Sequence, residues 1–362
     1  MKHLFEPYSL PSTTLNNRVV MAPMTRARRP DHVPGPDTAE YYRQRAGAGL
    51  IITEGVFVSP QAQGYSDVPG LWTDEQRAGW AVVTDAVHDA GGRIFAQLWH
   101  VGRVSHTSLQ PAGAAPVGPS TLQAQAHAWV QGVGFLDASR PRALGTDEIP
   151  RLTADFADAA ARAVQAGFDG VELHGAHGFL FEQFLNPHVN DRTDRYGGSV
   201  ENRARFLLEA LDALIDRIGA QRVAVRLSPF TRASDLPADD QAEAVYAYLA
   251  PELARRHLAY VHLSDLRLGG AADVPEDFLK TFRAAYDGTI LLAGGLDRTR
   301  AEELIASDLI DLAVFGRPFI ANPDLVERMR HNLPLATPDP DTFYGGGAVG
   351  YTDYPHHDGS AA

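Results

Sequence analysis

The chain has 362 residues, 44% of them hydrophobic, which suits one large domain, and it has no cysteine, so disulfides, thiolate metal sites and cysteine nucleophiles are excluded. Its formal charge of −13 argues against a nucleic-acid partner. We find neither an apolar N-terminal segment of signal length nor an apolar run long enough to span a membrane, so a cytoplasmic protein is expected.

Short apolar runs alternate with helical patterns along most of the chain. Strands are predicted at Val19–Ala22, Leu50–Glu54, Ile94–Trp99, Gly170–His174, Val223–Ser228, Tyr260–Ser264, Thr289–Ala293 and Leu312–Phe315. Such near-continuous apolar runs are typical of parallel strands that are covered on both faces. Helices are predicted at Asp74–Ala90, Thr153–Ala166, Ser199–Ile218, Ala238–Arg256, Pro275–Tyr286, Thr299–Ala306 and Pro323–Arg330. This alternation predicts a (β/α)₈ TIM barrel as a single α/β domain over residues 1–362.

Three segments lie outside the alternation. Residues 3–15 are predicted to form a short hairpin that closes the bottom of the barrel. The Pro-, Gly- and Ala-rich segment 101–150 separates the third strand from its helix, and we interpret it as a cap over the C-terminal face; a tolerated surface loop is the alternative. From Phe343 onwards the tail is expected to fold back, because its tyrosines are costly to leave in water.

The most informative segment begins at Val171 and reads Val-Glu-Leu-His-Gly-Ala-His-Gly-Phe-Leu. A short strand runs into His174 and His177, and a long polar loop then leads to a helix that Ser199 caps. Without context, a structural histidine pair at a strand end is the commonest interpretation. A metal site is less favoured, because the spacing is not that of the helical H-E-x-x-H motif and no third ligand stands out.

This segment closely resembles the signature of the Old Yellow Enzyme family, the FMN-dependent ene-reductases, and the resemblance extends in order from Asn17 to Tyr354. It implies non-covalent FMN that is reduced by NADPH or NADH in a ping-pong cycle. Hydride from flavin N5 would then reduce the activated C=C bond of an enone or nitroalkene. His174 and His177 would hydrogen-bond the oxygen of the substrate's electron-withdrawing group, as donors do in an oxyanion hole.

Two polar residues within apolar strands are candidates for binding the pyrimidine edge of the flavin. Arg226 is predicted to point into the barrel, where a guanidinium needs an anion. An internal ion pair with Glu54 or Glu172 is the alternative. Gln97 carries a buried amide that needs both a donor and an acceptor, and neighbouring side chains could also supply them. The resemblance implies that both residues bind FMN.

Further cofactor positions follow from the same resemblance. The backbone of Pro23 and Met24 would lie along the flavin, and the Thr25 hydroxyl would bond flavin O4, which is the pattern of the threonine subgroup. A threonine after a strand is otherwise most often a cap. Gly55, at the end of the second strand, is also assigned to the cofactor.

The loops after the seventh and eighth strands are the usual phosphate site of such barrels. They contain the glycine-bearing turns with Gly294, Gly295 and Gly316, followed by Arg317. Glycines expose backbone N–H groups and an arginine can bind an oxyanion. The sequence therefore predicts a mononucleotide phosphate here.

Tyr65, Trp99 and Tyr351 match family aromatics that line the substrate pocket, although Trp99 could simply be packing. Phe179 departs from the family, because most members carry a tyrosine proton donor there and phenylalanine has no proton to give. General acid catalysis typically contributes about 10²–10⁴-fold. Water, Tyr65 or Tyr351 could replace the donor. Nitro compounds or nitrate esters could be the substrates, the enzyme could be an isomerase or a dehydrogenase of cyclic carbonyls, or Phe179 could be engineered.

Two functions from other classes remain as alternatives. In a metal-dependent barrel hydrolase, the two histidines would be ligands. A non-catalytic barrel would bind flavin or phosphate without turnover, against which Gln97, Arg226 and the histidine pair argue. The favoured function needs no metal. It takes a small activated alkene or nitro compound as its partner, in a monomer or homodimer.

Overall fold

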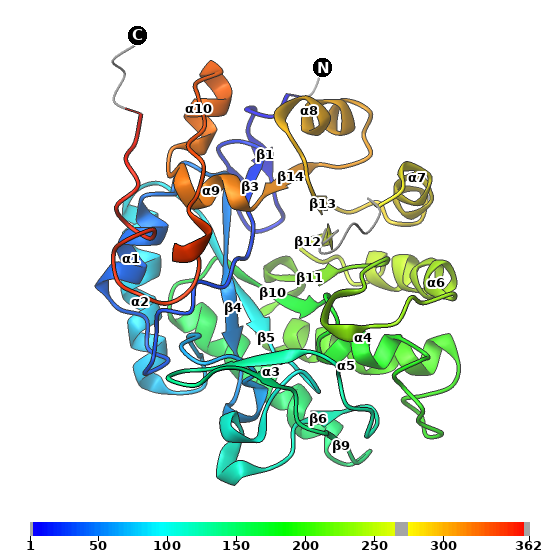
Figure 1. Ribbon diagram of the computed structural model, residues 1–362. Coiled ribbons are helices and arrows are strands. Elements are labelled where there is room, and N and C mark those ends of the chain that lie inside the picture. Colours follow the sequence, from blue (N-terminus) through cyan, green and yellow to red (C-terminus); the bar gives the residue numbers. More distant parts are fainter. Residues whose placement is uncertain (1–2, 265–273, 358–362) are drawn as a thin grey trace.

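The computed structural model describes residues 3–264 and 274–357, and its centre is a closed barrel of parallel strands (Figure 1). In barrel order the strands are β10 (Gly170–Gly175), β11 (Val223–Leu227), β12 (Tyr260–Ser264), β13 (Ile290–Ala293), β14 (Leu312–Phe315), β3 (Val19–Met21), β4 (Leu50–Phe57) and β5 (Ile94–Trp99). All eight predicted strands are present, so the (β/α)₈ barrel is confirmed.

Helices surround the barrel, and those predicted from the sequence are confirmed with shifted ends (Figure 1). They are α2 (Asp74–Asp89), α3 (Ile149–Gln165), α5 (Val200–Ile218), α6 (Ala242–Ala254), α7 (Glu276–Ala285), α8 (Arg298–Ala306) and α10 (Leu325–His331). The sequence did not predict α1 (Pro36–Arg43), α4 (Leu180–Leu185) and α9 (Arg317–Ala321). Within the described residues, no helix has both the length and the apolar character that crossing a membrane requires.

Local chemistry sets the helix ends. The Thr73 side chain accepts a hydrogen bond from the Gln76 N–H and so caps α2, and Ser199 caps α5 in the same way by accepting from the Asn202 N–H. Helix α3 begins before the predicted Thr153, because Pro150 occupies its first turn, where the missing N–H costs nothing.

Side chains that point into the barrel are arranged in layers, because alternate residues of a strand face the same side. The lowest layer is apolar and contains Phe95, Ala224 and Tyr260. The N-terminal hairpin, β1 (Tyr8–Ser9) and β2 (Thr14–Leu15), packs its buried Leu10 and Leu15 into the same cluster. The predicted closure of the barrel bottom is thereby confirmed.

The insertion between β5 and α3 lies against the loops at the C-terminal ends of the strands. Its elements are η2 (Thr107–Leu109), η3 (Pro111–Gly113), β6 (Val117–Gly118), β7 (His127–Val130), β8 (Gly134–Asp137) and β9 (Arg142–Ala143). Trp129 bridges to Tyr65 in the loop after β4, and the Gln125 N–H donates to Asp235 after β11 at 2.9 Å. Its position is that of a cap; a separate subdomain at about 101–150 stays a prediction.

The C-terminal tail folds back onto the barrel, as expected. The Tyr351 ring is fully buried and stacks on Tyr41 of α1 with ring centroids 4.2 Å apart. The Arg26 guanidinium donates to the Gly350 carbonyl at 2.7 Å. The remaining short helices are η1 (Pro60–Ala62), η4 (Ala220–Arg222), η5 (Ala233–Asp235) and η6 (Pro340–Thr342).

Candidate active site

A polar layer crosses the barrel directly above the apolar one. Gln97, Glu172, Arg226 and His262 come from the neighbouring strands β5, β10, β11 and β12, and each is at most 6% exposed. The Gln97 amide donates to Glu172 Oε1 at 2.7 Å, and His262 Nδ1 lies 2.9 Å from Glu172 Oε2. Glu172 of β10 is therefore joined to β5 and β12 through hydrogen bonds and to β11 through the charge of Arg226.

Arg226 keeps its charge in this layer. Burial lowers the pKa of Arg226 to about 10, and the Glu172 carboxylate opposes that change, so the guanidinium is protonated at neutral pH. Its Nη2 donates to Ser264 Oγ at 2.9 Å, while its buried Nε has no hydrogen-bond partner among the described residues. Glu54 does not pair with it, because the Glu54 carboxylate accepts from the backbone N–H groups of Arg26 and Ala27 at 3.0 and 3.2 Å.

His174 and His177 meet above the polar layer, as the sequence predicts. Their ring centroids are 5.4 Å apart with the planes 87° from parallel, and both residues are about 95% buried, at 5% and 6% exposure. Burial, followed by the charge of Arg226, holds the pKa of each imidazole well below its usual range. Both rings are therefore neutral at physiological pH, and each can donate one N–H to an acceptor.

Hydrogen bonds fix His177 at its backbone and at its ring. The backbone has a left-handed φ of 59°, which is uncommon for a residue other than glycine. The His177 N–H donates to Ser228 Oγ at 2.8 Å, and its Nε2 lies 2.9 Å from Ser264 Oγ. Since Ser264 also accepts from Arg226, one hydroxyl links the charged residue of the polar layer to the histidine.

Aromatic rings form a wall beside the histidines. The Trp99 indole stacks on Tyr65, with centroids 5.6 Å apart, and on His174, at 5.9 Å. Phe179 meets Trp99 and His174 edge to face at 4.9 and 5.2 Å. Gly55 lies within β4, and a Cβ there would come within 2.4 Å of the Trp99 ring. The missing side chain of Gly55 thus makes room for this indole.

Two of the three tail tyrosines, Tyr344 and Tyr351, lie in different surroundings. Tyr351 is packed against Tyr41 and fully buried, so the structure gives no support to its predicted contact with substrate. Tyr344 is 64% exposed and is close enough to Tyr65 to influence it electrostatically. Burial, followed by the Tyr344 phenol, raises the pKa of Tyr65 to about 12, so Tyr65 is protonated at neutral pH.

The predicted phosphate residues converge at the ends of β13, β14 and β3. Gly294 and Gly295 have φ values of 140° and 58°, which favour glycine. A Cβ on Gly316 would meet only Ala22 and Met24, both at 3.7 Å, so the space before it is open. Arg317 follows with an exposed side chain, and Pro23, Met24 and Thr25 lie half-buried at the end of β3.

These features fit the FMN expected from the sequence. The buried Nε–H of Arg226, which has no partner in the described part of the chain, and the charge of the guanidinium suit an anionic ring edge. The positive φ values of Gly294 and Gly295 and the open space before Gly316 suit a backbone site for a phosphate, with Arg317 next in the chain. Gln97 can offer FMN its amide oxygen and one N–H, because its other N–H donates to Glu172.

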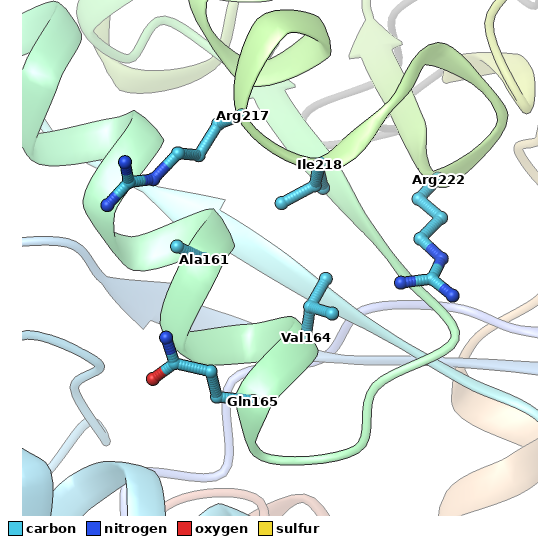
Figure 2. A pocket seen from close by; sticks show the side chains of 6 residues that line it. All are labelled: Ala161, Val164, Gln165, Arg217, Ile218 and Arg222. Carbon is cyan, nitrogen blue, oxygen red and sulfur yellow. The ribbon is translucent and has the colours of Figure 1, made fainter.

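A hollow of about 470 Å³ lies at the opposite end of the barrel and is a different feature (Figure 2). Side chains from α3 and from the end of α5 and η4 line it: Ala161, Val164, Gln165, Arg217, Ile218 and Arg222. Arg222 directly precedes β11, so this hollow adjoins the N-terminal ends of the strands. Within residues 3–264 and 274–357, no group of three or more His, Cys, Asp or Glu side chains could hold a metal ion.

Several residues of the site were missed by sequence reasoning. Ser228 and Ser264, which hold His177, follow the inward-facing Arg226 and His262 by two positions, and this parity could have indicated them. His262 itself interrupts an apolar strand, as Gln97 does. Glu182 and Tyr344 gave no comparable signal.

Comparisons with known proteins agree with this geometry. A family model described as "NADH:flavin oxidoreductase / NADH oxidase family" matches residues 3–336. The chain is 43% identical over 357 residues to a putative 12-oxophytodienoate reductase 11 of Oryza sativa subsp. japonica, covering 97% of both chains. A structure of morphinone reductase in complex with tetrahydroNAD is similar with a TM-score of 0.96 and 50% identity over 99% of both chains. The old yellow enzyme homologue from Zymomonas mobilis gives a TM-score of 0.93 and 39% identity, covering 98% of this chain and 99% of that one.

Proposed function

Since this chain belongs to the NADH:flavin oxidoreductase / NADH oxidase family, in its Old Yellow Enzyme branch, we propose that it reduces activated C=C bonds with electrons from NADPH or NADH. The comparisons confirm the family, the enzyme class and the FMN cofactor that the sequence predicts. The choice of enones and nitroalkenes as substrates, the ping-pong order and the roles of single residues are our proposal.

The observation that carries the proposal is the neutral pair His174 and His177 above a charged arginine. An enone carbonyl or nitro oxygen between the rings would accept an N–H from each imidazole. As the alkene is reduced, negative charge develops on that oxygen, and preformed donors in a buried site stabilise it better than water does. Arg226 adds positive potential through Ser264 without itself needing to reach the oxygen.

The cofactor's place follows from the residues that fit it. When bound, FMN supplies the two-electron redox chemistry that couples nicotinamide oxidation to alkene reduction. Gln97 and Arg226 would bind the pyrimidine edge, and Thr25 a flavin carbonyl, as in the threonine subgroup. The remaining contacts are assigned to Pro23, Met24 and Gly55 along the ring and to Gly294, Gly295, Gly316 and Arg317 at the phosphate.

The proton for the second alkene carbon must come from a group other than Phe179. Tyr65 is the best placed phenol, because it stacks on the same Trp99 indole that Phe179 contacts and is protonated at neutral pH. Tyr344 lies next to it, and water is the remaining source. We propose Tyr65 or water as the donor.

A second function is favoured by Phe179 itself, whose ring is 92% buried against Trp99 and His174 (8% exposed) and offers only carbon atoms. Nitro compounds and nitrate esters need no proton at that position. Reduction of such compounds, or an isomerase or dehydrogenase reaction of cyclic carbonyls, is therefore the second candidate.

Anaerobic stopped-flow absorbance at 450–460 nm tests these proposals. The purified protein is first mixed with NADPH or NADH and then with cyclohexenone. Bleaching of the flavin band by the nucleotide and prompt recovery with the enone is the expected result. Recovery with a nitro compound alone would favour the second function, and a protein without a flavin band would contradict both.

A further inference from the structure

Two consecutive left-handed residues carry the oxygen-binding histidine. His177 and Gly178 have φ values of 59° and 78°, and a Cβ on Gly178 would lie 2.4 Å from the Ala233 carbonyl oxygen. Left-handed backbone costs a histidine free energy and persists only where the surroundings enforce it. The position of the His177 ring therefore depends on whatever holds this turn.

A buried carboxyl group holds the turn from behind. Glu182 of α4, 5% exposed, accepts the Gly178 N–H at Oε2 at 2.6 Å. Its Oε1 accepts the Ser228 hydroxyl at 2.7 Å, and the same hydroxyl oxygen accepts the His177 N–H at 2.8 Å. Both N–H groups of the turn are thus bound to Glu182, one directly and one through Ser228.

The next residue of α4 binds the following peptide unit of the same turn, through the Gly178 carbonyl. Gln183, fully buried, donates from Nε2 to the Gly178 carbonyl at 2.7 Å and to the Val101 carbonyl at 2.9 Å. Its Oε1 accepts the Arg103 N–H at 3.0 Å. Gln183 therefore also ties the loop after β5, whereas the hydrogen bonds of Glu182 all concern the His177 turn.

Buried carboxyl groups are usually found in ion pairs. Among the described residues, no lysine, arginine or histidine forms a salt bridge with it; Asp239, Tyr246 and Ser228 lie around the small cavity of about 20 Å³ that adjoins it. Burial raises the pKa of Glu182 to about 8, with Asp239 adding to the rise. Within the described part of the chain, the side-chain hydrogen bonds of Glu182 go to Gly178 and Ser228, and both of these bonds fix the geometry of the His177 turn.

We propose that Glu182 is the positioning residue of the active site, which sets the place of the His177 imidazole through Gly178 and Ser228. The proposal rests on the proposed function, in which His177 binds the substrate oxygen. Misplacing a catalytic group by about 1 Å can cost about 100-fold in rate. Loss of Glu182 should therefore reduce enone turnover without removing any group that touches substrate.

The test compares FMN-loaded variants in a double-mutant cycle with His177→Ala. Glu182→Met removes both hydrogen bonds at similar volume, and we expect kcat/KM for cyclohexenone to fall about 10- to 100-fold. Glu182→Gln should lose less, because its carbonyl can still accept the Gly178 N–H while its amide donates to Ser228. Glu201→Gln, at an exposed glutamate of α5, is the matched control and should leave kcat/KM unchanged.

The cycle separates positioning from general damage. If Glu182 acts through His177, Glu182→Met should change kcat/KM less than about twofold when His177 is already alanine, because the two residues act as a unit. An equal loss in both backgrounds, or no loss in either, would overturn the proposal.

A readout independent of turnover is hydrogen exchange of the backbone amides of residues 176–179. Faster exchange in Glu182→Met, with an unchanged FMN content, is the expected result, and unchanged exchange contradicts the proposal. If the unmodified protein fails to reduce the enone, the proposed function fails, and the exchange measurement still decides whether Glu182 holds the turn.

Discussion

The two ends of the barrel interior differ in chemistry although the same strands build both. At the lower end, Phe95, Ala224 and Tyr260 pack with the leucines of the N-terminal hairpin. Two residues further along each strand, the inward positions hold Gln97, Arg226 and His262, joined by Glu172. The lower layer follows the ordinary rule of an apolar core, and the upper layer departs from it.

The apolar lower layer stabilises the fold, whereas the polar upper layer is suited to binding a ligand. Buried polar groups cost free energy unless they are paired, and a removed partner leaves the other group uncompensated. Among the described residues, Arg226 Nε and His262 Nε2 of the upper layer and His174 Nδ1 above it have no hydrogen-bond partner, while the lower layer is closed by side-chain packing and includes one such atom, the Tyr260 hydroxyl oxygen. Substitutions in the two layers should therefore separate stability from activity.

The lower layer can be broken with Leu15→Ala. Leu15 is fully buried in the cluster that closes the barrel, so the free energy of unfolding should fall by about 2–5 kcal/mol. Denaturant unfolding measures this change, and stopped-flow reduction of cyclohexenone should be unaltered in the folded variant. A parallel loss of turnover would show that the two layers are not separable.

Above the polar layer, His174→Ala should have the converse effect. Loss of one donor to a developing oxyanion typically costs about 100- to 1,000-fold, and we expect that loss in kcat/KM for the enone. The loss of unfolding free energy should be smaller than in Leu15→Ala, because His174 Nδ1 has no hydrogen-bond partner among the described residues, although the ring contacts with Trp99 and Phe179 are lost. His188→Ala, at a half-exposed surface histidine, is the control; a His174 variant that turns over normally would refute the assigned role.

Phe179, which contacts His174 and Trp99, allows a test of which group protonates the substrate. Phe179→Tyr places a phenol at the ring that contacts His174 and Trp99, and enone reduction should accelerate by about 10- to 100-fold if protonation limits the rate. Tyr65→Phe in the unmodified background should slow it if Tyr65 is the present donor. Steady-state rates in H₂O and D₂O measure both effects, and two unaffected variants would leave water as the donor.

The strands and the histidine pair could be predicted because each depends on local pattern. Buried parallel strands are continuous apolar runs, and strand ends at one face bring His174, Trp99 and Arg226 together. The short α1, α4 and α9 could not be predicted in this way, since they have few turns in which a period could show. Their positions depend on tertiary contacts, of α1 with α2 and of α4 with β10 and α5.

Side-chain contacts between different elements could not be predicted from the sequence. Glu172 was weighed only as an ion partner of Arg226, whereas it bonds Gln97 and His262. Glu182 holds His177 only because α4 turns back beneath its own preceding loop. In the glycine-rich tail, the sequence did not indicate that Tyr351 turns inward to Tyr41 while Tyr344 stays beside Tyr65.

The smallest expected effect is on the pH dependence of stability, and it comes from the Glu182 carboxyl at the upper end of the barrel. The pKa of Glu182 is about 8 in the folded protein, against about 4.3 for an unperturbed glutamate. Between these values the folded state binds the additional proton, so the contribution of Glu182 to stability is fully present below about pH 4.3 and is lost as the pH rises through 8. Relative to Glu182→Gln, the unmodified protein should therefore lose about 1.4 kcal/mol of unfolding free energy per pH unit in this window. Denaturant unfolding of both proteins at pH 5.5, 6.5 and 7.5 measures the two slopes. Every other titrating group is shared by the two proteins. Parallel curves would therefore mean that the Glu182 carboxyl is ionised throughout this range and that its burial is better compensated than its hydrogen bonds alone allow.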